Sequence, residues 1–250
     1  MAPHEPPVLP PDEVHVWRVP LEQPASVLGR LRALLDEGEL SRAERFHFAR
    51  DRDHFVVARG VLRTLLGSYL GVGPAALSFA YNPFGKPSLK DEGDAPPVRF
   101  NLSHSHGLAL CAFARERELG VDVERVRAEF AGDEIAEHFF AAREVAALRG
   151  LGPDQKTEAF FNCWTRKEAY IKAIGEGLSH PLESFTVSLR PGEPAALLSV
   201  EGDPAETRRW SLTALEPAPG YVAALVVERP GWRLNCFEWT ADATLRSSQA

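Results

Sequence analysis

The stretch that decides the fold is "ELGVDVERV", residues 118–126. Side chains of a strand alternate between its two faces, so Val121 and Val123 point one way while Asp122 and Glu124 point the other. Two carboxylates on one face repel each other unless a cation lies between them, and Mg²⁺ prefers such oxygen ligands. An amphipathic strand whose acidic face meets water is the commoner arrangement, and from this stretch alone it stays open.

A second charged segment follows about 40 residues later, "WTRKEAYIKAIGEG", residues 164–177. Its pattern predicts a helix in which Glu168 and Lys172, four residues apart, share a face. Such a pair can simply support a solvated helix by a few tenths of a kcal/mol. The alternative is that Glu168 and Lys172 hold a metal ion and a phosphate.

Small polar residues end a predicted strand at "FNLSHSHG", residues 100–107. Imidazolium and hydroxyl groups donate well to phosphate, which makes His104, Ser103 and Ser105 candidates for a ligand site. A plain hairpin turn explains the stretch equally well. Two histidines without a third ligand at metal spacing are weak evidence for zinc.

Two further features bring positive charge. "PFGKP", residues 83–87, presents Lys86 on a turn bounded by prolines, although most such lysines are merely exposed. Residues 42–63 carry a local cationic excess that suits a phosphorylated ligand, or else a solvated helix face. Its cationic and imidazole side chains are Arg42, Arg45, Arg50, Arg52, Arg59, Arg63, His47 and His54.

Composition excludes several classes of protein. The chain has 250 residues, 44% of them hydrophobic and 25% charged, which is typical of a globular protein, and its net charge of −7 argues against general nucleic-acid binding. Three scattered cysteines indicate neither a disulfide scaffold nor zinc. There is no secretory signal and no apolar run of about 20 residues, so we expect a cytoplasmic protein without a membrane partner.

The element pattern predicts an α+β protein of two halves, residues 1–118 and 119–250, with residues 1–13 as a flexible leader. Residues 45–55 and 138–148 share a few positions, a weak internal repeat. Walker, GxGxxG, HExxH and GxSxG motifs are absent, so phosphate must be held by side chains and a metal. We expect strands at 13–19, 98–105, 108–114, 118–126 and through the last third, helices within 24–72 and at 133–149 and 157–174, and a core face of Val56, Leu62, Leu65, Leu66 and Tyr69.

Taken in order, these segments resemble the Sfp-type 4′-phosphopantetheinyl transferases. The resemblance covers roughly residues 40–190 and includes "FGKP", "FNLSHS", "GVDVE", "FFAAREV" and "FFNCWTRKEAYIKAIGEGLSHPLESFTV". It implies two similar α+β halves related by a pseudo-twofold, with coenzyme A bound between them. It also implies Mg²⁺-dependent transfer of 4′-phosphopantetheine from coenzyme A to a serine of an apo acyl or peptidyl carrier protein, releasing adenosine 3′,5′-bisphosphate.

The resemblance also implies roles for individual residues. The metal ligands would be Asp122, Glu124 and Glu168, for Mg²⁺ or Mn²⁺, with Glu168 also a candidate general base. Lys172 would reach the pyrophosphate, and Lys167 would contact either phosphate or solvent. The remaining coenzyme contacts would be Ser103 and His104 at the phosphates, Lys86 near the adenine nucleotide, and His54, where many relatives have arginine, assisted by Arg52.

The resemblance implies a monomer that docks a fatty-acid, polyketide or nonribosomal-peptide carrier beside the cleft. Arg125 and Arg127 would meet an acidic carrier helix, and Phe139 or Phe140 would add apolar contact unless they lie in the core. Two other functions stay open. One is a Mg²⁺-dependent phosphohydrolase that cleaves a nucleotide pyrophosphate with water. The other is a non-catalytic carrier-binding module.

Overall fold

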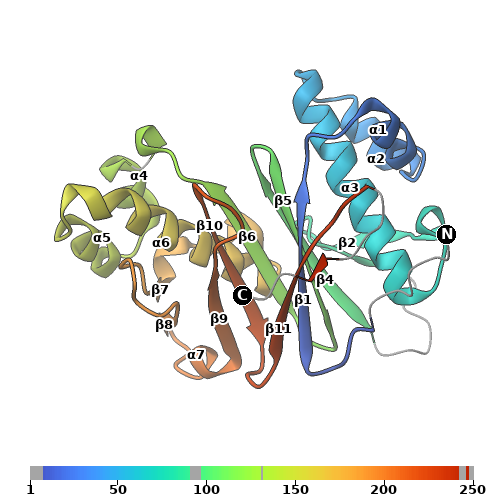
Figure 1. Ribbon diagram of the computed structural model, residues 1–250. Coiled ribbons are helices and arrows are strands. Elements are labelled where there is room, and N and C mark those ends of the chain that lie inside the picture. Colours follow the sequence, from blue (N-terminus) through green and yellow to red (C-terminus); the bar gives the residue numbers. More distant parts are fainter. Residues whose placement is uncertain (1–7, 91–96, 131, 242–245, 248–250) are drawn as a thin grey trace.

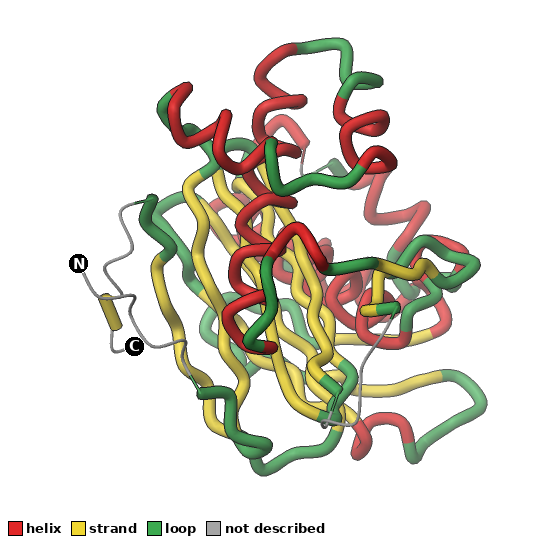
Figure 2. The backbone as a smooth tube through the Cα atoms, turned by 90° about the vertical axis from the view of Figure 1, so that its right-hand side faces the viewer, coloured by secondary structure: helices red, strands yellow, loops and turns green. Residues whose placement is uncertain are grey.

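Two long helices and the sheets beside them organise the computed structural model, which describes residues 8–90, 97–130, 132–241 and 246–247. Figure 1 shows helices on the two outer sides and strands between them, and Figure 2 shows the strands running side by side through the middle. The N-terminal half comprises β1 (Glu13–Pro20), α1 (Ala25–Arg32), α2 (Glu37–Ala43), α3 (Ala49–Leu70), β2 (Phe79–Tyr81), β3 (Pro87–Leu89), β4 (Val98–Ser105) and β5 (Leu108–Arg115).

The C-terminal half repeats this order of elements. It comprises β6 (Leu119–Arg125), α4 (Asp133–Phe139), α5 (Ala142–Arg149), α6 (Pro153–Ile174), β7 (Phe185–Val187), β8 (Leu197–Val200), α7 (Glu206–Arg209), β9 (Trp210–Leu215) and β10 (Tyr221–Glu228). The antiparallel order β1-β5-β4 of the first half recurs as β6-β10-β9 in the second. The expectation of an α+β protein with two similar halves is therefore confirmed.

The chain ends outside this repeat. β11 (Arg233–Glu238) pairs in parallel with β1, and β12 (Arg246–Ser247) pairs with β11. The strand-rich end was expected to belong wholly to the second half, but these two strands complete the sheet of the first. β11 and β12, which follow the second half in the chain, therefore belong to the five-stranded sheet of the first half.

Three of the four hydrophobic clusters among the described residues border the sheets. Leu108, Leu110 and Ala112 of β5 face a core between the two sheets, whereas Cys111 and Phe113 face the core under α3. A third core lies under α6. Because both faces of the central strands are buried, they read as almost continuous apolar runs in the sequence. The predicted core face of α3 is buried as expected: Val56, Leu62, Leu65, Leu66 and Tyr69.

α3 and α6 have the same kind of ending. Each is followed by a glycine in the left-handed conformation, Gly71 with φ 68° and Gly175 with φ 80°. A residue with a Cβ is strained there, so glycine permits the chain to leave the helix. The two helices consequently end sharply and return the chain toward the sheets.

Some boundaries differ from expectation. The predicted helix 133–149 is two helices, because extended Phe140 turns into the core and Glu144 caps the next helix by accepting from the Ala141 N–H at 2.9 Å. Leu9, expected in a flexible leader, is buried. Residues 1–7 of the predicted leader lie outside the described residues, as do residues 91–96. Among the described helices, none is long and apolar enough to cross a membrane.

Candidate functional site

The two halves meet along a seam between β4 and β6 that is made by side chains rather than by a backbone ladder. Alternate residues of β4 point at the edge of β6 and accept from its N–H groups, which would otherwise be buried without partners. Asn101 Oδ1, Ser103 Oγ and Ser105 Oγ accept from the N–H groups of Val121, Val123 and Arg125 at 3.0, 3.3 and 3.2 Å. The seam therefore aligns the serines with the acidic face of β6.

Asp122 lies at the centre of this arrangement. The Ser103 hydroxyl donates to Asp122 Oδ1 at 2.8 Å, and Lys172 Nζ lies 2.6 Å from the same oxygen. Lys172 also donates to Ser103 Oγ at 3.1 Å. Asp122 is buried, and its second oxygen, Oδ2, has no hydrogen-bond partner within the described part of the chain. A buried carboxylate oxygen without a partner is costly unless a ligand supplies one.

Glu124 and Glu168 complete an acidic cluster. The Ser105 hydroxyl donates to Glu124 Oε2 at 2.6 Å. Desolvation raises the pKa of Glu168 to about 7, and the negative charges of Asp122 and Glu124 add to this shift against the opposing charge of Lys172. Desolvation and the charge of Asp122 also raise the pKa of Glu124. The three carboxylates therefore act on one another electrostatically.

Lys172 balances this negative charge. Burial alone would lower the pKa of Lys172, but Asp122, Glu168 and Glu124 outweigh that effect, so the pKa is raised. The ammonium thus stays protonated at neutral pH. One cation facing three carboxylates leaves the cluster with an excess of negative charge.

Gly120 explains how α6 comes so close to β6. A Cβ at Gly120 would lie 2.2 Å from the carbonyl oxygen of Ala169 and 2.4 Å from the nitrogen of Ala173. The strand can pack directly on the helix backbone only because this position has no side chain. Asp122 on the strand and Lys172 on the helix are brought into contact by that approach.

The donor set suits a hard divalent cation, although its oxygens are not gathered into a closed site. Among the residues that the structure describes, no three His, Cys, Asp or Glu side chains are close enough together to hold a metal ion. Lys172 instead provides the positive charge beside Asp122. The partnerless Oδ2 of Asp122, with Glu124 and Glu168 nearby, nevertheless fits the oxygen chemistry of Mg²⁺.

Basic side chains lie next to the acidic cluster. His104 is exposed, yet the protein around it lowers the pKa of His104 by desolvation, and the charges of Lys172, His54 and Arg42 add to the shift. His54 is buried, with Nε2 lacking a hydrogen-bond partner among the described residues. His104 and His54 are therefore near each other, whereas Arg52 pairs with its neighbour Asp53 at 3.2 Å.

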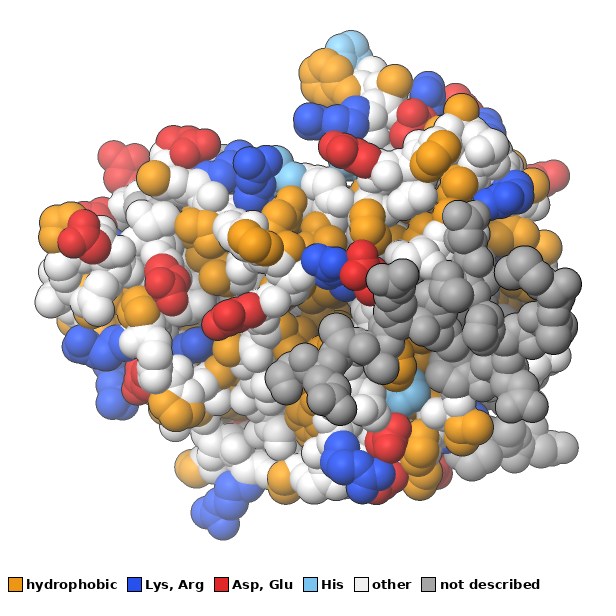
Figure 3. Space-filling view, viewed as in Figure 1, with side chains coloured by type: hydrophobic (Ala, Val, Ile, Leu, Met, Phe, Trp, Pro, Cys, Tyr) orange, Lys and Arg blue, Asp and Glu red, His pale blue; other side chains and the backbone are white. Residues whose placement is uncertain are grey.

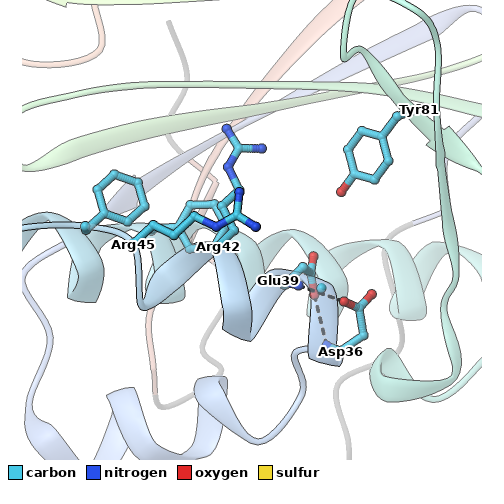
Figure 4. Close-up of a pocket in the computed structure, with 8 residues that line it drawn as sticks. Asp36, Glu39, Arg42, Arg45 and Tyr81 are labelled. Atoms are coloured by element: carbon cyan, nitrogen blue, oxygen red, sulfur yellow. Dashed lines mark hydrogen bonds between the residues drawn. The ribbon is translucent and has the colours of Figure 1, made fainter.

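A cavity of about 630 Å³ opens beside α2 and α3, and Figure 4 shows Arg42 and Arg45 across from Tyr81. Its lining residues are Asp36, Gly38, Glu39, Arg42, Arg45, Phe46, Phe55 and Tyr81. The sequence placed Arg42 and Arg45 in a cationic segment, and their helical spacing was the available signal. Tyr81 was missed because only the fold brings its short strand to this cavity.

Not every arginine of that segment is available to a ligand. Buried Glu39 accepts from Arg59 Nε at 2.7 Å and from Arg63 Nε at 2.6 Å. Arg59 also donates to the Tyr81 hydroxyl at 3.2 Å. A buried cation needs such pairing, so Arg59 and Arg63 support the cavity wall.

Lys167 does not reach the site, which corrects the expected contact with phosphate or solvent. Its side chain is completely buried, and Nζ lies 2.8 Å from Glu144 Oε2. It also donates to the carbonyl oxygens of Leu182 and Phe185 at 2.8 and 2.7 Å. Lys167 is therefore held on the side of α6 that contacts α5 and the start of β7.

Two other expected coenzyme contacts are already occupied by protein groups. The buried Ser103 hydroxyl bonds Asp122, Val123 and Lys172, so it positions the acidic cluster. Lys86 Nζ lies 2.8 Å from Glu118 Oε2. Lys86 lines a separate cavity of about 250 Å³, so a contact with the nucleotide stays a prediction.

The surface expected to dock a carrier holds some of the predicted side chains, and its role stays a prediction. Arg125 is exposed. Desolvation lowers the pKa of His106, and the positive charges of Arg127, Arg125 and Arg50 lower it further. Cations of both halves therefore lie near His106. Figure 3 shows a notch between the halves with basic and histidine side chains on both sides. Phe140 is buried in the core and is not available for docking.

Two family models match this chain. The model of the 4′-phosphopantetheinyl transferase superfamily matches residues 118–226, and that of the 4′-phosphopantetheinyl transferase N-terminal region matches residues 22–116. A crystal structure of Thermotoga maritima holo-[acyl-carrier-protein] synthase aligns with 48% of this chain and 66% of its own, at 22% identity and a TM-score of 0.36.

Two named relatives align over most of their length. The 4′-phosphopantetheinyl transferase Sfp of Bacillus subtilis is 28% identical over 202 residues, covering 80% of this chain and 85% of Sfp. The 4′-phosphopantetheinyl transferase HetI of a Nostoc species is 45% identical over 222 residues, covering 89% of this chain and 90% of HetI. The chain therefore belongs to the 4′-phosphopantetheinyl transferase family.

Proposed function

We propose that the junction of β4, β6 and α6 is where this 4′-phosphopantetheinyl transferase moves the 4′-phosphopantetheine group from coenzyme A to a serine of an apo carrier protein. The observation that carries the proposal is the contact among Asp122, Lys172 and Ser103, with the partnerless Asp122 Oδ2 beside it. A single region then offers carboxylates for a cation and an ammonium for phosphate.

Coenzyme A would lie across the basic side chains next to this junction. His104 would contact the 3′-phosphate, with His54 and Arg42 close enough to share its charge. The cavity of about 630 Å³ that Arg42 and Arg45 line is large enough for part of a nucleotide, with Tyr81 on its wall. Arg52 stays as an expected contact at the edge of the nucleotide, whereas the Lys86 ammonium is held by Glu118 and two backbone carbonyls.

Asp122, Glu124 and Glu168 would hold Mg²⁺, with Mn²⁺ as the alternative. A bound divalent cation supplies neutralisation of the pyrophosphate charge. Asp122 and Glu124 support this assignment because their charges both raise the pKa of Glu168, in addition to desolvation. Ser103 and Ser105 hold Asp122 and Glu124 in place.

The chain's own residues contribute positioning and electrostatics, which account for most of the catalysis of phosphoryl transfer. The carrier serine oxygen forms a bond to the phosphorus that bears pantetheine, and the bond from that phosphorus to the bridging oxygen breaks. Adenosine 3′,5′-bisphosphate leaves with the bonding electrons, and Lys172 stabilises the charge on it. Glu168 is the candidate to accept the serine proton, directly or through a water.

The carrier protein would dock over the notch between the halves, where Arg125 and Arg127 face an acidic helix. Phe139, which packs edge-on against Trp164, is the available aromatic contact. We further propose that the protein works as a monomer in the cytoplasm. Fatty-acid, polyketide and nonribosomal-peptide carriers are all candidate clients.

Intact-protein mass spectrometry tests the proposal. An apo carrier is incubated with coenzyme A, Mg²⁺ and the wild type, Asp122→Asn or Asp133→Asn, an exposed control. We expect a phosphopantetheine mass gain with the wild type and the control, slowed about 100-fold or more by Asp122→Asn. No gain with any carrier class overturns the proposal, and release of adenosine 3′,5′-bisphosphate without a carrier would instead indicate a phosphohydrolase.

A further inference from the structure

The turn between β2 and β3 reaches from the first half into the second and contacts the end of α6. Asn82 Nδ2 donates to the carbonyl oxygen of Gly175 at 2.6 Å, and Lys86 Nζ donates to that of Ala173 at 2.8 Å. The last carbonyls of a helix lack partners within it, and a positive charge there is favourable. The turn 82–86 thus caps the C-terminus of α6 across the boundary between the halves.

The turn itself is held in one shape. Asn82 Oδ1 accepts from the N–H groups of Phe84 and Lys86 at 3.0 and 2.8 Å, and the Asn82 N–H donates to the Lys86 carbonyl at 3.1 Å. Gly85 takes the left-handed conformation, with φ 86°. Asn82 therefore orders the turn with its oxygen and contacts α6 with its nitrogen.

The fit against α6 leaves little room for movement. A Cβ at Gly175 would lie 3.1 Å from Asn82 Nδ2 and 3.2 Å from Lys86 Cδ. A Cβ would therefore be in tight contact with both side chains, which shows that the turn packs directly on Gly175, the residue that ends the helix. A shift of the turn would consequently move the end of α6 with it.

Lys86 also fixes the start of β6. Its ammonium lies 2.8 Å from Glu118 Oε2 and donates to the Leu119 carbonyl at 3.3 Å, in addition to Ala173. An ammonium has three donors, and these three acceptors use them all. Arg99 lies 3.1 Å from the other oxygen of Glu118. The ammonium is thus shared between β6 and α6 rather than open to an anion.

Both segments that Lys86 contacts lead directly to the reacting groups. Lys172 immediately precedes Ala173, and Asp122 lies three residues after Leu119. We infer that Asn82 and Lys86 form an interhalf clasp, a pair of positioning residues that sets Lys172 against Asp122. This inference rests on the proposed function for the roles of Lys172 and Asp122.

The test compares Lys86→Met and Asn82→Ala with Lys90→Met, which removes an exposed lysine four residues on. For each variant, kcat is measured by carrier modification and the Kd of coenzyme A by calorimetry. A small misplacement of catalytic groups can cost about 100-fold in rate, so we expect kcat to fall about 10- to 100-fold. The Kd should stay within about twofold, because only transition-state contacts are lost.

Hydrogen exchange supplies a measurement that is independent of activity. Compared with the wild type, the clasp variants should show faster amide exchange in residues 170–178 and unchanged exchange in residues 153–163. Lys90→Met should change the exchange rate of neither segment. If the wild type modifies no carrier, the proposed function fails, whereas the exchange result still decides whether the clasp holds α6.

Two results would overturn the inference. A Kd raised about tenfold or more with kcat unchanged would make Lys86 a coenzyme contact. A lower melting temperature with kcat and Kd both unchanged, measured where the variants are fully folded, would leave the clasp a purely stabilising contact. Non-additive losses of kcat in the double variant are expected, since Asn82 orders the turn that presents Lys86.

Discussion

At the scale of single residues, Ser103 shows how one hydroxyl can organise a site. It donates once, to Asp122, and accepts twice, from Val123 and Lys172. Replacing it by alanine leaves the buried Val123 N–H without its partner. We expect Ser103→Ala to lower the free energy of unfolding by about 1–3 kcal/mol, measured by urea denaturation.

The matched control is Ser68→Ala, which removes a hydroxyl bonded to a carbonyl of its own helix, that of Thr64. Alanine is the better helix former, so this change should be neutral or slightly stabilising. Equal losses in the two variants would show that the seam hydroxyl has no special role. Carrier modification by Ser103→Ala should also slow, because Asp122 and Lys172 lose their common partner.

His15 predicts a pH dependence of stability. It is buried, and its Nδ1 lies 2.8 Å from the Tyr69 hydroxyl, which already accepts from Trp17 Nε1. The Tyr69 hydroxyl has one proton to donate, and Nδ1 can accept it only while the ring is neutral. Desolvation lowers the pKa of His15 despite the neighbouring carboxylate of Glu13.

Because the pKa of His15 is lower in the folded state, the unfolded chain binds more protons below its ordinary pKa of about 6.5. The contribution of neutral His15 to the free energy of unfolding is fully present above that pH, and it is lost as the pH falls toward the folded-state pKa. Urea denaturation between pH 7.5 and 5.5 should show a loss of up to about 1.4 kcal/mol per pH unit from this group. His15→Gln should flatten the profile, and His47→Gln, an exposed control, should not; parallel profiles for all three would refute the assignment.

At the scale of elements, the packing of α6 on β6 depends on Gly120. A Cβ there would meet the backbone of Ala169 and Ala173, which cannot yield without moving the helix. We expect Gly120→Ala to lower the free energy of unfolding by about 1–3 kcal/mol or more, and to reduce transferase activity because Lys172 shifts. Gly107→Ala, whose nearest contact would be 3.7 Å away, is the control and should retain both stability and activity.

The same pair of elements marks what the sequence could predict. Strand alternation correctly separated Val121 and Val123, which lie in the core between the sheets, from Asp122, which faces α6. Helical spacing placed Glu168 and Lys172 on one face, but it could not show that Lys167 pairs with buried Glu144 from another helix. That contact depends on how two helices pack, and no local pattern records it.

At the scale of the whole molecule, the repeat is visible in the topology rather than in the residues that suggested it. Residues 45–55 lead into α3, whereas residues 138–148 end α4 and form most of α5, so they are not equivalent. The order of strands in the two sheets is equivalent. The pairing of β11 with β1 joins two strands that lie more than two hundred residues apart, and hydrophobic alternation gives no information about such a partner.

This long-range pairing predicts that the two halves unfold together. Phe237 of β11 stacks on Trp17 at 4.7 Å between ring centroids, and both sheets contribute to the core between them. If either half unfolded, the apolar face of the other half's sheet would therefore be exposed to water. We expect one calorimetric transition, with a van't Hoff enthalpy equal to the calorimetric enthalpy.

Phe237→Ala should move that single transition rather than split it. Phe237 is only partly buried, so we expect a loss of about 2 kcal/mol, below the range for a fully buried phenylalanine. For a chain of this size that loss corresponds to a fall in Tm of about 4–8 °C. Leu198→Ala, which shortens an exposed side chain of β8, should leave Tm nearly unchanged. Two resolved transitions, of which Phe237→Ala moves only the one that belongs to the first half, would show that the halves are independent and that β11 merely covers an edge of β1.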